Sequence, residues 1–188
     1  EVQDKIYLIW IDQISKALWL KILKVQEAFP INGNGYFLCD IKPIQLTESI
    51  ESNFDTSFVI LRDKFLYGLC EIKNTDYLFS LNLKKTKQKI RKIKKFDNFA
   101  GNLSSNPKGN LFSWVEWSSD NMPWEKNSLF FAIIDDYGEI KKIKEFNNRV
   151  VNDRKNVSFF QPYWISNDIL VCSEDSTGWW NLCFLDVT

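Results

Sequence analysis

WVEWSSDNMPW, residues 114–124, places three tryptophans within eleven residues. Two further aromatic stretches follow it, FQPYW at residues 160–164 and TGWWNL at residues 177–182. Neither core packing nor turn chemistry requires so many tryptophans at these positions. Each stretch adjoins a short apolar run bounded by Asn, Asp, Gly or Pro, which is the pattern of a β-strand between turns. These runs, together with the others along the chain, decide the fold class.

The short apolar runs repeat along the chain. Three segments that begin at Leu78, Leu129 and Leu182 have apolar residues at offsets 0, +3 and +5, so successive segments lie 51 and 53 residues apart. Ala17, Leu20 and Ile22 fit the same offsets earlier in the chain. Internal repeats of roughly 40–50 residues with four strands each are typical of the blades of a β-propeller.

Each repeat contains up to four candidate strands. A second apolar run precedes each segment with the 0, +3 and +5 pattern. Further short apolar runs begin or close most of the repeats. These additional runs lie at residues 6–10, 57–61, 65–70, 101–104, 111–116, 160–164 and 169–173, with closing runs at 43–46, 89–94 and 140–144. The predicted units are residues 1–50, 51–97, 98–150 and 151–188, the last of them incomplete.

The predicted fold is all-β: a partial β-propeller of about three to four blades of four-stranded antiparallel sheet, in a single region spanning residues 1–188. Blades stack face to face, so both faces of a strand can be buried, which accounts for continuous apolar runs such as residues 129–134. A β-sandwich would tolerate the same runs, and periodicity alone leaves it open. Because a partial ring has exposed edges, we expect an arc that self-associates through its open blade edges, or a chain that continues at one or both ends.

Charge and cysteine content exclude several classes of function. The chain has 24 basic and 24 acidic residues, so no overall field favours nucleic acid or a membrane surface. The basic stretch from Lys84 to Lys95 fits a solvated strand edge better than a nucleic-acid patch, because lysine blunts edge pairing. Four scattered cysteines without C-x-x-C spacing, in a chain without histidine, predict no zinc site and indicate a reducing cytoplasm. No apolar run reaches membrane-spanning length.

The residues for catalysis are also missing from this chain. Without histidine no Ser-His-Asp or Cys-His arrangement is possible, and no Gly-x-Ser-x-Gly nucleophile elbow occurs. Gly33-Asn34-Gly35 and Lys108-Gly109-Asn110 fit turns. Asp135 and Asp136 fit another turn; a carboxylate pair for glycoside hydrolysis is the weaker alternative, since their spatial separation decides it. We assign no catalytic residue, and no metal or organic cofactor is implied.

Two long stretches carry a family resemblance. In the first, Asn106-Pro107-Lys108-Gly109 and Leu111-Phe112-Ser113-Trp114 precede the segment from Glu116 to Glu125; in the second, FQPYW at 160–164 precedes STGWWNL at 176–182. Both resemble blades of the β-propeller in acylaminoacyl-peptidase-like and dipeptidyl-aminopeptidase-like members of the prolyl oligopeptidase family of serine peptidases. The resemblance covers residues 98–188 well, 51–97 as a generic blade and 1–50 weakly. Ser119-Asp120 stands where the family has His-Pro.

The resemblance implies a function for the chain. The complete enzyme would remove acylated or unblocked residues from short peptides, and its propeller would restrict access to a buried catalytic triad. This chain would then be a gating and peptide-binding module, inactive alone, that acts with a hydrolase domain of the same or a separate chain. A stand-alone protein-interaction scaffold, or the remnant of a split peptidase, is the alternative. A carbohydrate-binding module that uses Trp platforms is a weaker one.

The candidate substrate-binding or domain-interface residues lie in the two Trp-rich stretches: Asn121, Met122, Pro123, Trp124, Trp179 and Trp180. In one interpretation, residues 121–124 project toward the hydrolase domain or the central opening of the propeller and position peptides there. In the other, these side chains fix one blade to the next, since a buried aromatic side chain covers ~150–250 Å². The sequence leaves both interpretations open.

Overall fold

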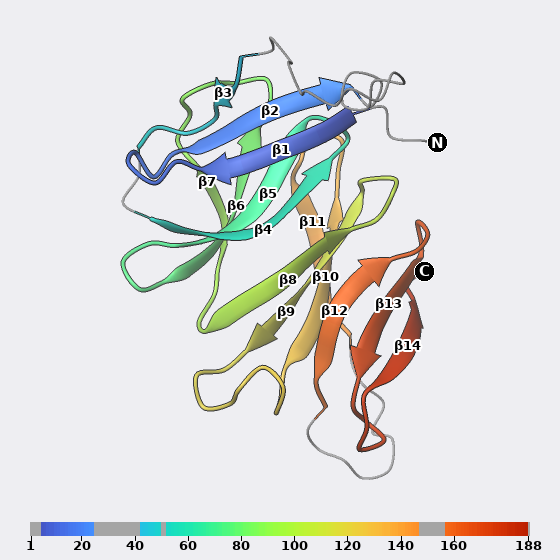
Figure 1. The fold of residues 1–188 in the computed structure, drawn as a ribbon. Coiled ribbons are helices and arrows are strands. Elements are labelled where there is room, and N and C mark those ends of the chain that lie inside the picture. The colour runs from blue at the N-terminus through green and yellow to red at the C-terminus, as the bar shows by residue number, and fades with distance from the viewer. Residues whose placement is uncertain (1–4, 25–41, 50–51, 147–156, 188) are drawn as a thin grey trace, which may run out of the picture.

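The protein is built from short antiparallel strands. The computed structural model describes residues 5–24, 42–49, 52–146 and 157–187. Within these ranges the chain forms fourteen strands and no helix, arranged in four small sheets that follow one another along an arc (Figure 1). The all-β prediction is confirmed. The turn predicted at residues 33–35 and Cys39 lie outside the described residues.

Each sheet is made of strands that are consecutive in the sequence and antiparallel to their neighbours. The first sheet has the order β1-β2-β3, the second β4-β5-β6-β7, the third β8-β9-β10-β11 and the fourth β12-β13-β14. The strands are β1 (Lys5–Ile11), β2 (Leu18–Lys24), β3 (Ile44–Gln45), β4 (Asn53–Leu61), β5 (Phe65–Glu71), β6 (Asp76–Asn82), β7 (Arg91–Lys95), β8 (Phe99–Ser105), β9 (Leu111–Trp117), β10 (Ser128–Ile134), β11 (Ile140–Glu145), β12 (Phe159–Trp164), β13 (Ile169–Glu174) and β14 (Asn181–Asp186).

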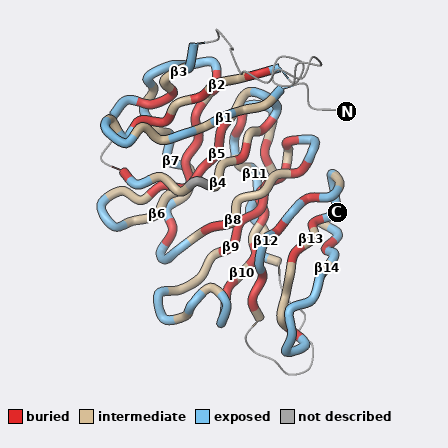
Figure 2. The backbone as a smooth tube through the Cα atoms, in the orientation of Figure 1, coloured by how far each residue is buried: buried red, intermediate tan, exposed pale blue. Residues whose placement is uncertain are grey.

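Three apolar cores hold the arc together, one between each pair of neighbouring sheets. Leu18 and Phe79 belong to the core between the first two sheets, and Leu78 and Trp114 to the next core. The third core joins the last two sheets and includes Leu129. Because the second and third sheets have a neighbour on each side, both faces of their middle strands are buried (Figure 2). This explains why these strands are continuously apolar instead of alternating.

The turns use the residues that their backbone geometry needs. Gly109, in the turn between β8 and β9, has φ 68°, a left-handed conformation that side chains with a Cβ rarely adopt. A Cβ on this residue would also lie 3.0 Å from the backbone nitrogen of Arg62. The Asn106 side chain completes the turn by accepting hydrogen bonds from the amides of Asn110 and Leu111. The predicted turn at Lys108-Gly109-Asn110 is confirmed.

The predicted alignment of the first sheet with the later repeats is wrong by a small shift. Leu81, Ala132 and Leu185, which share one position in the spaced segments, all face the sheet that precedes their own. Leu20 has the same offset in the sequence but packs on the sheet that follows its own. Since side chains alternate between the two faces of a strand, the alignment of Leu20 with Leu81 is shifted by an odd number of residues.

The basic stretch forms an outer edge, as predicted. β7 is the last strand of the second sheet, and its side chains are exposed or half-buried. Lys92 and Lys94 lie over the rings of Tyr77 and Phe96, with each ammonium nitrogen 4.1 Å from the ring centroid. Lys94 also binds the Glu116 carboxylate at 2.8 Å. These lysines therefore stabilise the edge of the sheet through local contacts.

Candidate functional site: a polar cavity at one end of the four sheets

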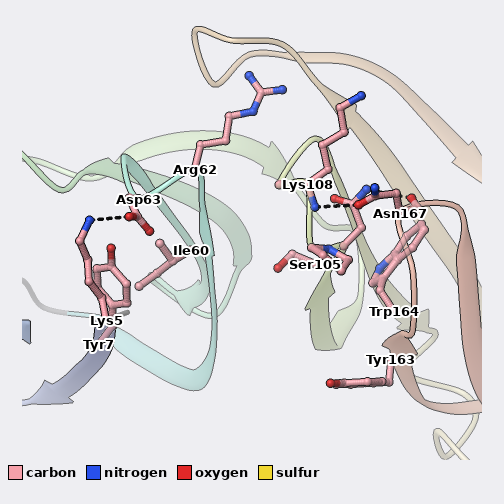
Figure 3. A pocket seen from close by; sticks show the side chains of 13 residues that line it. Lys5, Tyr7, Ile60, Arg62, Asp63, Ser105, Lys108, Tyr163, Trp164 and Asn167 are labelled. Atoms are coloured by element: carbon pink, nitrogen blue, oxygen red, sulfur yellow. Dashed lines mark hydrogen bonds and ion pairs between the residues drawn. The ribbon is translucent and has the colours of Figure 1, made fainter. Parts of the chain in front are cut away.

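A cavity lies at one end of the four sheets, between strand ends and turns that belong to all of them. The strands β4, β8 and β12 end there, and β1 begins there. The turns that follow β4 and β8, the turn between β12 and β13, and the first residues of β1 enclose a volume of about 1170 Å³. Figure 3 shows the side chains that line it, which come from segments far apart in the sequence. The arc thus gathers turns from successive sheets around one opening.

Charged groups dominate one side of this cavity. Lys5 binds Asp63 with 2.6 Å between the ammonium nitrogen and the carboxylate oxygen (Figure 3). The Tyr7 hydroxyl donates a hydrogen bond to the same carboxylate. The hydrogen bond from Lys5, followed by that from Tyr7, holds the pKa of Asp63 below its usual range. Burial, together with the neighbouring Asp63 carboxylate, raises the pKa of Tyr7. Both groups therefore keep their ordinary charge at neutral pH, with Asp63 ionised and Tyr7 protonated.

Two further cations lie on turns of the second and third sheets. The Arg62 guanidinium pairs with the carboxylate of Asp136, which is highly exposed. Lys108 is held through its backbone, whose amide donates a 3.0 Å hydrogen bond to the Asn167 side chain. Its ammonium group has no ion-pair partner among the residues that the structure describes. Three cations and the one carboxylate of Asp63 line the cavity, so the lining is net positive in a chain of zero net charge.

The wall of the cavity on the fourth sheet is aromatic. Trp164 is buried there, and its indole nitrogen donates a 3.2 Å hydrogen bond to the Ser113 hydroxyl on the third sheet. Tyr163 is exposed and also lines the cavity. A β-bulge between Phe160 and Tyr163, with Gln161 at φ 50°, changes the register of β12 just before these two rings. Bulges of this kind re-aim the side chains that follow them.

The predicted site residues lie away from this cavity. Asn121, Met122, Pro123 and Trp124 are in the loop between β9 and β10, and Trp179 and Trp180 are in the loop between β13 and β14. β9 and β13 begin at the cavity and run away from it, so both loops lie at the opposite end of the sheets. None of the six residues lines the cavity. Their predicted position at a hydrolase domain or at the central opening of a complete propeller stays a prediction.

The largest side chains of these loops are exposed, and both the packing and the domain-interface interpretation of the loops stay predictions. Trp124 is 61% exposed and Trp179 is 80% exposed, while Met122 and Trp180 are about half exposed. The tryptophans that do join sheet to sheet are Trp114 and Trp164, which are buried inside strands. Aromatic residues that face solvent contribute little to the core, so the two loops present rings on the surface.

Both loops are anchored to the beginning of β12. The Asn127 side chain accepts a 2.8 Å hydrogen bond from the Phe159 amide and donates one of 2.9 Å to the Phe159 carbonyl. It also donates a 2.6 Å hydrogen bond to the Pro123 carbonyl, which secures the loop that carries Trp124. The second loop is tied one residue earlier, where the Ser158 amide donates to Asp175 at 2.8 Å. The exposed rings are thus presented from loops with fixed ends.

Lys5, Arg62, Asp63 and Lys108 were not predicted as site residues. They lie in ordinary polar turns and at a strand start, where charged residues are common. The signal that could have found them is their position in the repeat, because each lies at the same end of its sheet. Within the described residues, no group of three His, Cys, Asp or Glu side chains could hold a metal ion. No helix in the described part of the chain is long and apolar enough to cross a membrane.

Solved structures with the same fold include several peptidases. Puromycin hydrolase, as an S511A mutant complexed with PGG, is 18% identical over 97% of this chain with a TM-score of 0.73. A puromycin-hydrolyzing peptidase from Mycobacterium tuberculosis is 16% identical over 98% of the chain, with a TM-score of 0.68. Prolyl oligopeptidase B from Galerina marginata is 11% identical over 98% of the chain, with a TM-score of 0.59.

These similarities concern the fold and a part of each protein. The chain spans 27–29% of the length of these three peptidases. No protein-family model matches the sequence, and no curated protein matches it. TolB from Acinetobacter baumannii, at 9% identity and a TM-score of 0.58, shares the same architecture. The chain therefore has the fold of part of a β-propeller, the domain type found in peptidases of the prolyl oligopeptidase family.

Proposed function

We propose that the chain is the non-catalytic propeller portion of an acylaminoacyl-peptidase-like serine peptidase. In this proposal residues 1–188 are one propeller region, with units at 1–50, 51–97, 98–150 and 151–188. It restricts and selects short peptides for a hydrolase domain that lies in the same chain or in a separate one. The fold shared with peptidase propellers supports this role, as does the absence of histidine, which leaves the chain without a Ser-His-Asp triad.

The observation that carries the proposal is the cavity at the meeting point of the four sheets. Its volume of about 1170 Å³ is large enough for a short peptide. Its lining includes the cations Arg62 and Lys108 and the aromatic side chains of Tyr163 and Trp164. A peptide carboxylate can pair with these cations while an apolar side chain contacts the rings. The chemistry favours short peptides with an acidic side chain or a free carboxyl terminus.

The test is direct peptide binding to the purified chain. We expect fluorescently labelled tetrapeptides with a free carboxyl terminus to bind saturably in an anisotropy titration, and the amidated forms to bind more weakly. No hydrolysis of aminoacyl or peptidyl substrates should accompany binding. Equal binding of both forms would contradict the role of the cations. Absence of any saturable binding would contradict the peptide-selecting function.

A second candidate function rests on the two exposed Trp-rich loops. Trp124, Trp179 and Trp180 are presented from anchored loops at the end of the sheets opposite the cavity. Exposed aromatic rings of this kind are typical of protein-interaction surfaces. In this alternative the chain is a stand-alone scaffold. Capture of a hydrolase partner by the purified chain, lost in Trp124→Ala, would favour the split-enzyme form of the first proposal over a scaffold with unrelated partners.

We place the protein in the cytoplasm in this proposal. Cys70, Cys172 and Cys183 are free thiols, and Cys172 is directly paired with Cys183 across β13 and β14 without a disulfide. Reduced cysteines in such positions are typical of a reducing compartment. Fractionation of the source cells, with detection of the chain in the cytosolic or the membrane and secreted fractions, tests this placement.

A further inference from the structure

Two cysteines lie directly opposite each other on the last two strands. Cys172 of β13 pairs with Cys183 of β14 in the antiparallel register. Directly opposed residues of an antiparallel pair have Cα atoms about 4.5 Å or about 5.5 Å apart, depending on the hydrogen-bonding position. Both separations fall within the range of about 4.4–6.8 Å that a disulfide spans. The backbone therefore already holds these two cysteines at a distance that a disulfide can bridge.

The two side chains also point the same way. Residues opposite one another in an antiparallel sheet share a face. Cys172 belongs to the core between the third and fourth sheets, and Cys183 packs against the same core. The neighbouring opposed pair, Leu170 and Leu185, is buried there as well. Burial, followed by the proximity of the Cys183 thiol, raises the pKa of Cys172 to about 12. The two thiols are therefore neighbours within one apolar environment.

The third described cysteine provides a contrast. Cys70 is buried in the core between the first two sheets, and the residues opposite it on the adjacent strands are Phe54 and Tyr77. A buried cysteine in such a place serves as a small apolar side chain. Packing accounts for Cys70 in the same way that it would account for Cys172 or Cys183 alone. The chemistry arises from placing two thiols opposite each other in a single pair of strands.

The two thiols of the pair differ in their access to solvent. Cys172 is 1% exposed, while Cys183 is half-buried. An external reagent therefore reaches Cys183 first. Burial raises the pKa of both thiols, so little of the reactive thiolate is present at neutral pH. The first reaction is accordingly slow, and the pair stays reduced where oxidant is scarce.

We propose that Cys172 and Cys183 form a reversible disulfide across β13 and β14 when a small-molecule disulfide such as glutathione disulfide is present. The Cys183 thiolate attacks one sulfur of the glutathione disulfide, which forms a mixed disulfide and releases the first glutathione thiol. The Cys172 thiolate then attacks the Cys183 sulfur and releases the second. In total, two protein thiols lose their protons and are oxidised to one disulfide, and one glutathione disulfide is reduced to two thiols.

The bond closes a covalent loop around the exposed tryptophans. It encloses residues 173–182, which include Trp179 and Trp180. The strands at both ends of this loop are then joined covalently, so oxidation restricts the conformations that are open to the hairpin. The inference is independent of the proposed peptide-selecting function, because it concerns the end of the sheets opposite the cavity.

Mass spectrometry of the full chain incubated with glutathione disulfide tests the proposal. All samples carry Cys39→Ser, so that every remaining thiol is one that the structure describes. We expect the mass to fall by two hydrogen atoms and to return after reduction with dithiothreitol. Residues 156–188 contain no Lys or Arg, so trypsin leaves both cysteines in one peptide. Cleavage after Glu174 then separates Cys172 from Cys183 unless a disulfide joins the two fragments.

Three variants test the pairing and the order of the two steps. Cys70→Val is the matched control and should form the same disulfide at the parent rate. Cys172→Val should stop at a mixed disulfide between Cys183 and glutathione. Cys183→Ser should leave Cys172 reduced, with a reaction at least ~tenfold slower than that of the parent. Circular dichroism verifies that each variant keeps its β-sheet structure before oxidation.

Two results would overturn the proposal. One is a parent chain that forms no disulfide between these two cysteines after prolonged incubation with an excess of glutathione disulfide. The other is a disulfide that joins Cys70 to Cys172 or Cys183, which would show that oxidation requires unfolding. A Cys183→Ser variant in which Cys172 reacts as fast as the parent pair would contradict the proposed order of the steps.

Discussion

The indole nitrogen of Trp164 donates a hydrogen bond to the hydroxyl oxygen of Ser113, 3.2 Å away, across the boundary between the third and fourth sheets. Both residues are buried, and Trp164 is also part of the cavity wall. A buried indole N–H that loses its partner has no water to replace it. This single contact therefore couples the packing of two sheets to the shape of the candidate site.

Replacing the acceptor should weaken that boundary. We expect Ser113→Ala to lower the free energy of unfolding by about 1–3 kcal/mol, since it leaves the Trp164 N–H buried and unpaired. Urea titration measures the change. Ser105→Ala, a substitution in the turn-facing end of β8, serves as the control and should have less effect. An unchanged midpoint for Ser113→Ala would show that the hydrogen bond contributes no net stability.

Asn127 should contribute more to the free energy of unfolding than any other residue of the loop between β9 and β10. Its side chain makes three hydrogen bonds, to the Pro123 carbonyl and to both backbone groups of Phe159. Asn127→Ala removes all three and should cost about 2–4 kcal/mol in unfolding free energy, because it leaves several backbone groups unsatisfied. Asn121→Ala removes one hydrogen bond to Ser118 near the surface and should cost less than about 1 kcal/mol. Equal costs for the two variants, measured by urea titration, would contradict this ranking.

Leu129 and Leu182 form a matched pair for the repeat. At a concentration where the chain is monomeric, Leu129→Ala should lower the unfolding free energy by about 2–5 kcal/mol, since it opens a cavity in the core between the last two sheets. Leu182→Ala should change it by less than about 0.5 kcal/mol, because that side chain is already in solvent. Urea titration of both variants measures the two losses of unfolding free energy. A large loss in Leu182→Ala would mean that its side chain is covered in the monomer.

Buried thiols predict a loss of stability at alkaline pH. Burial raises the pKa of the Cys70 and Cys172 thiols from the usual 9.0 to about 12, and that of the Tyr67 hydroxyl from 10.0 to about 12. Above pH 9 the unfolded chain releases thiol protons that the folded chain retains, so ionisation favours the unfolded state. The contribution of these three groups to stability should therefore be constant below about pH 9 and fall progressively between pH 9 and pH 12.

Urea titrations at successive pH values measure this decline. Cys172→Val removes one ionisable group and should make the decline shallower, while the remaining thiol and Tyr67 maintain the same sign. In the folded protein at pH 8, a thiol reagent should modify both buried cysteines much more slowly than after unfolding. Stability that rises above pH 9, or immediate modification of both thiols, would contradict the burial that the structure shows.

The cations of the cavity should set the preference for peptide carboxylates. Lys108→Ala removes an ammonium group that lacks an ion-pair partner in the described part of the chain, so it should weaken binding of a free-carboxyl tetrapeptide by about tenfold, or ~1.4 kcal/mol. Lys84→Ala, in an exposed turn outside the cavity, should leave binding unchanged. Added salt should weaken binding to the parent more than to Lys108→Ala. Identical affinities for the two variants in anisotropy titrations would place the peptide elsewhere.

Much of the fold could be predicted because the strands are short, local and regularly repeated. Polar turns and apolar runs such as 65–70 and 111–116 mark strands whose partners follow directly in the chain, so hairpin pairing needs little long-range information. The repeat distance was enough to predict blades. The face to which each residue points was less secure, as Leu20 shows, because a shift by one residue reverses the face without changing composition.

The candidate site was harder to predict than the fold. Trp124 and Trp179 are conspicuous in the sequence, yet residue type alone does not show whether a ring is exposed or buried, and Trp114 and Trp164 have the opposite environment. The cavity residues Lys5, Arg62 and Lys108 have no distinctive motif. They come close to one another only because the separate sheets place their corresponding turns and strand ends at the same end of the structure.

The sequence by itself determined the all-β class, the repeated antiparallel units and the lack of a histidine-based catalytic triad, because these depend on local patterns and composition. The tertiary structure decided which equivalent residues are buried and which are exposed. Leu129 and Leu182 occupy the same position in successive units, but only Leu129 has another sheet on its face. The physical reason is that burial is a property of two surfaces in contact, and the sequence pattern of a strand describes only one of them.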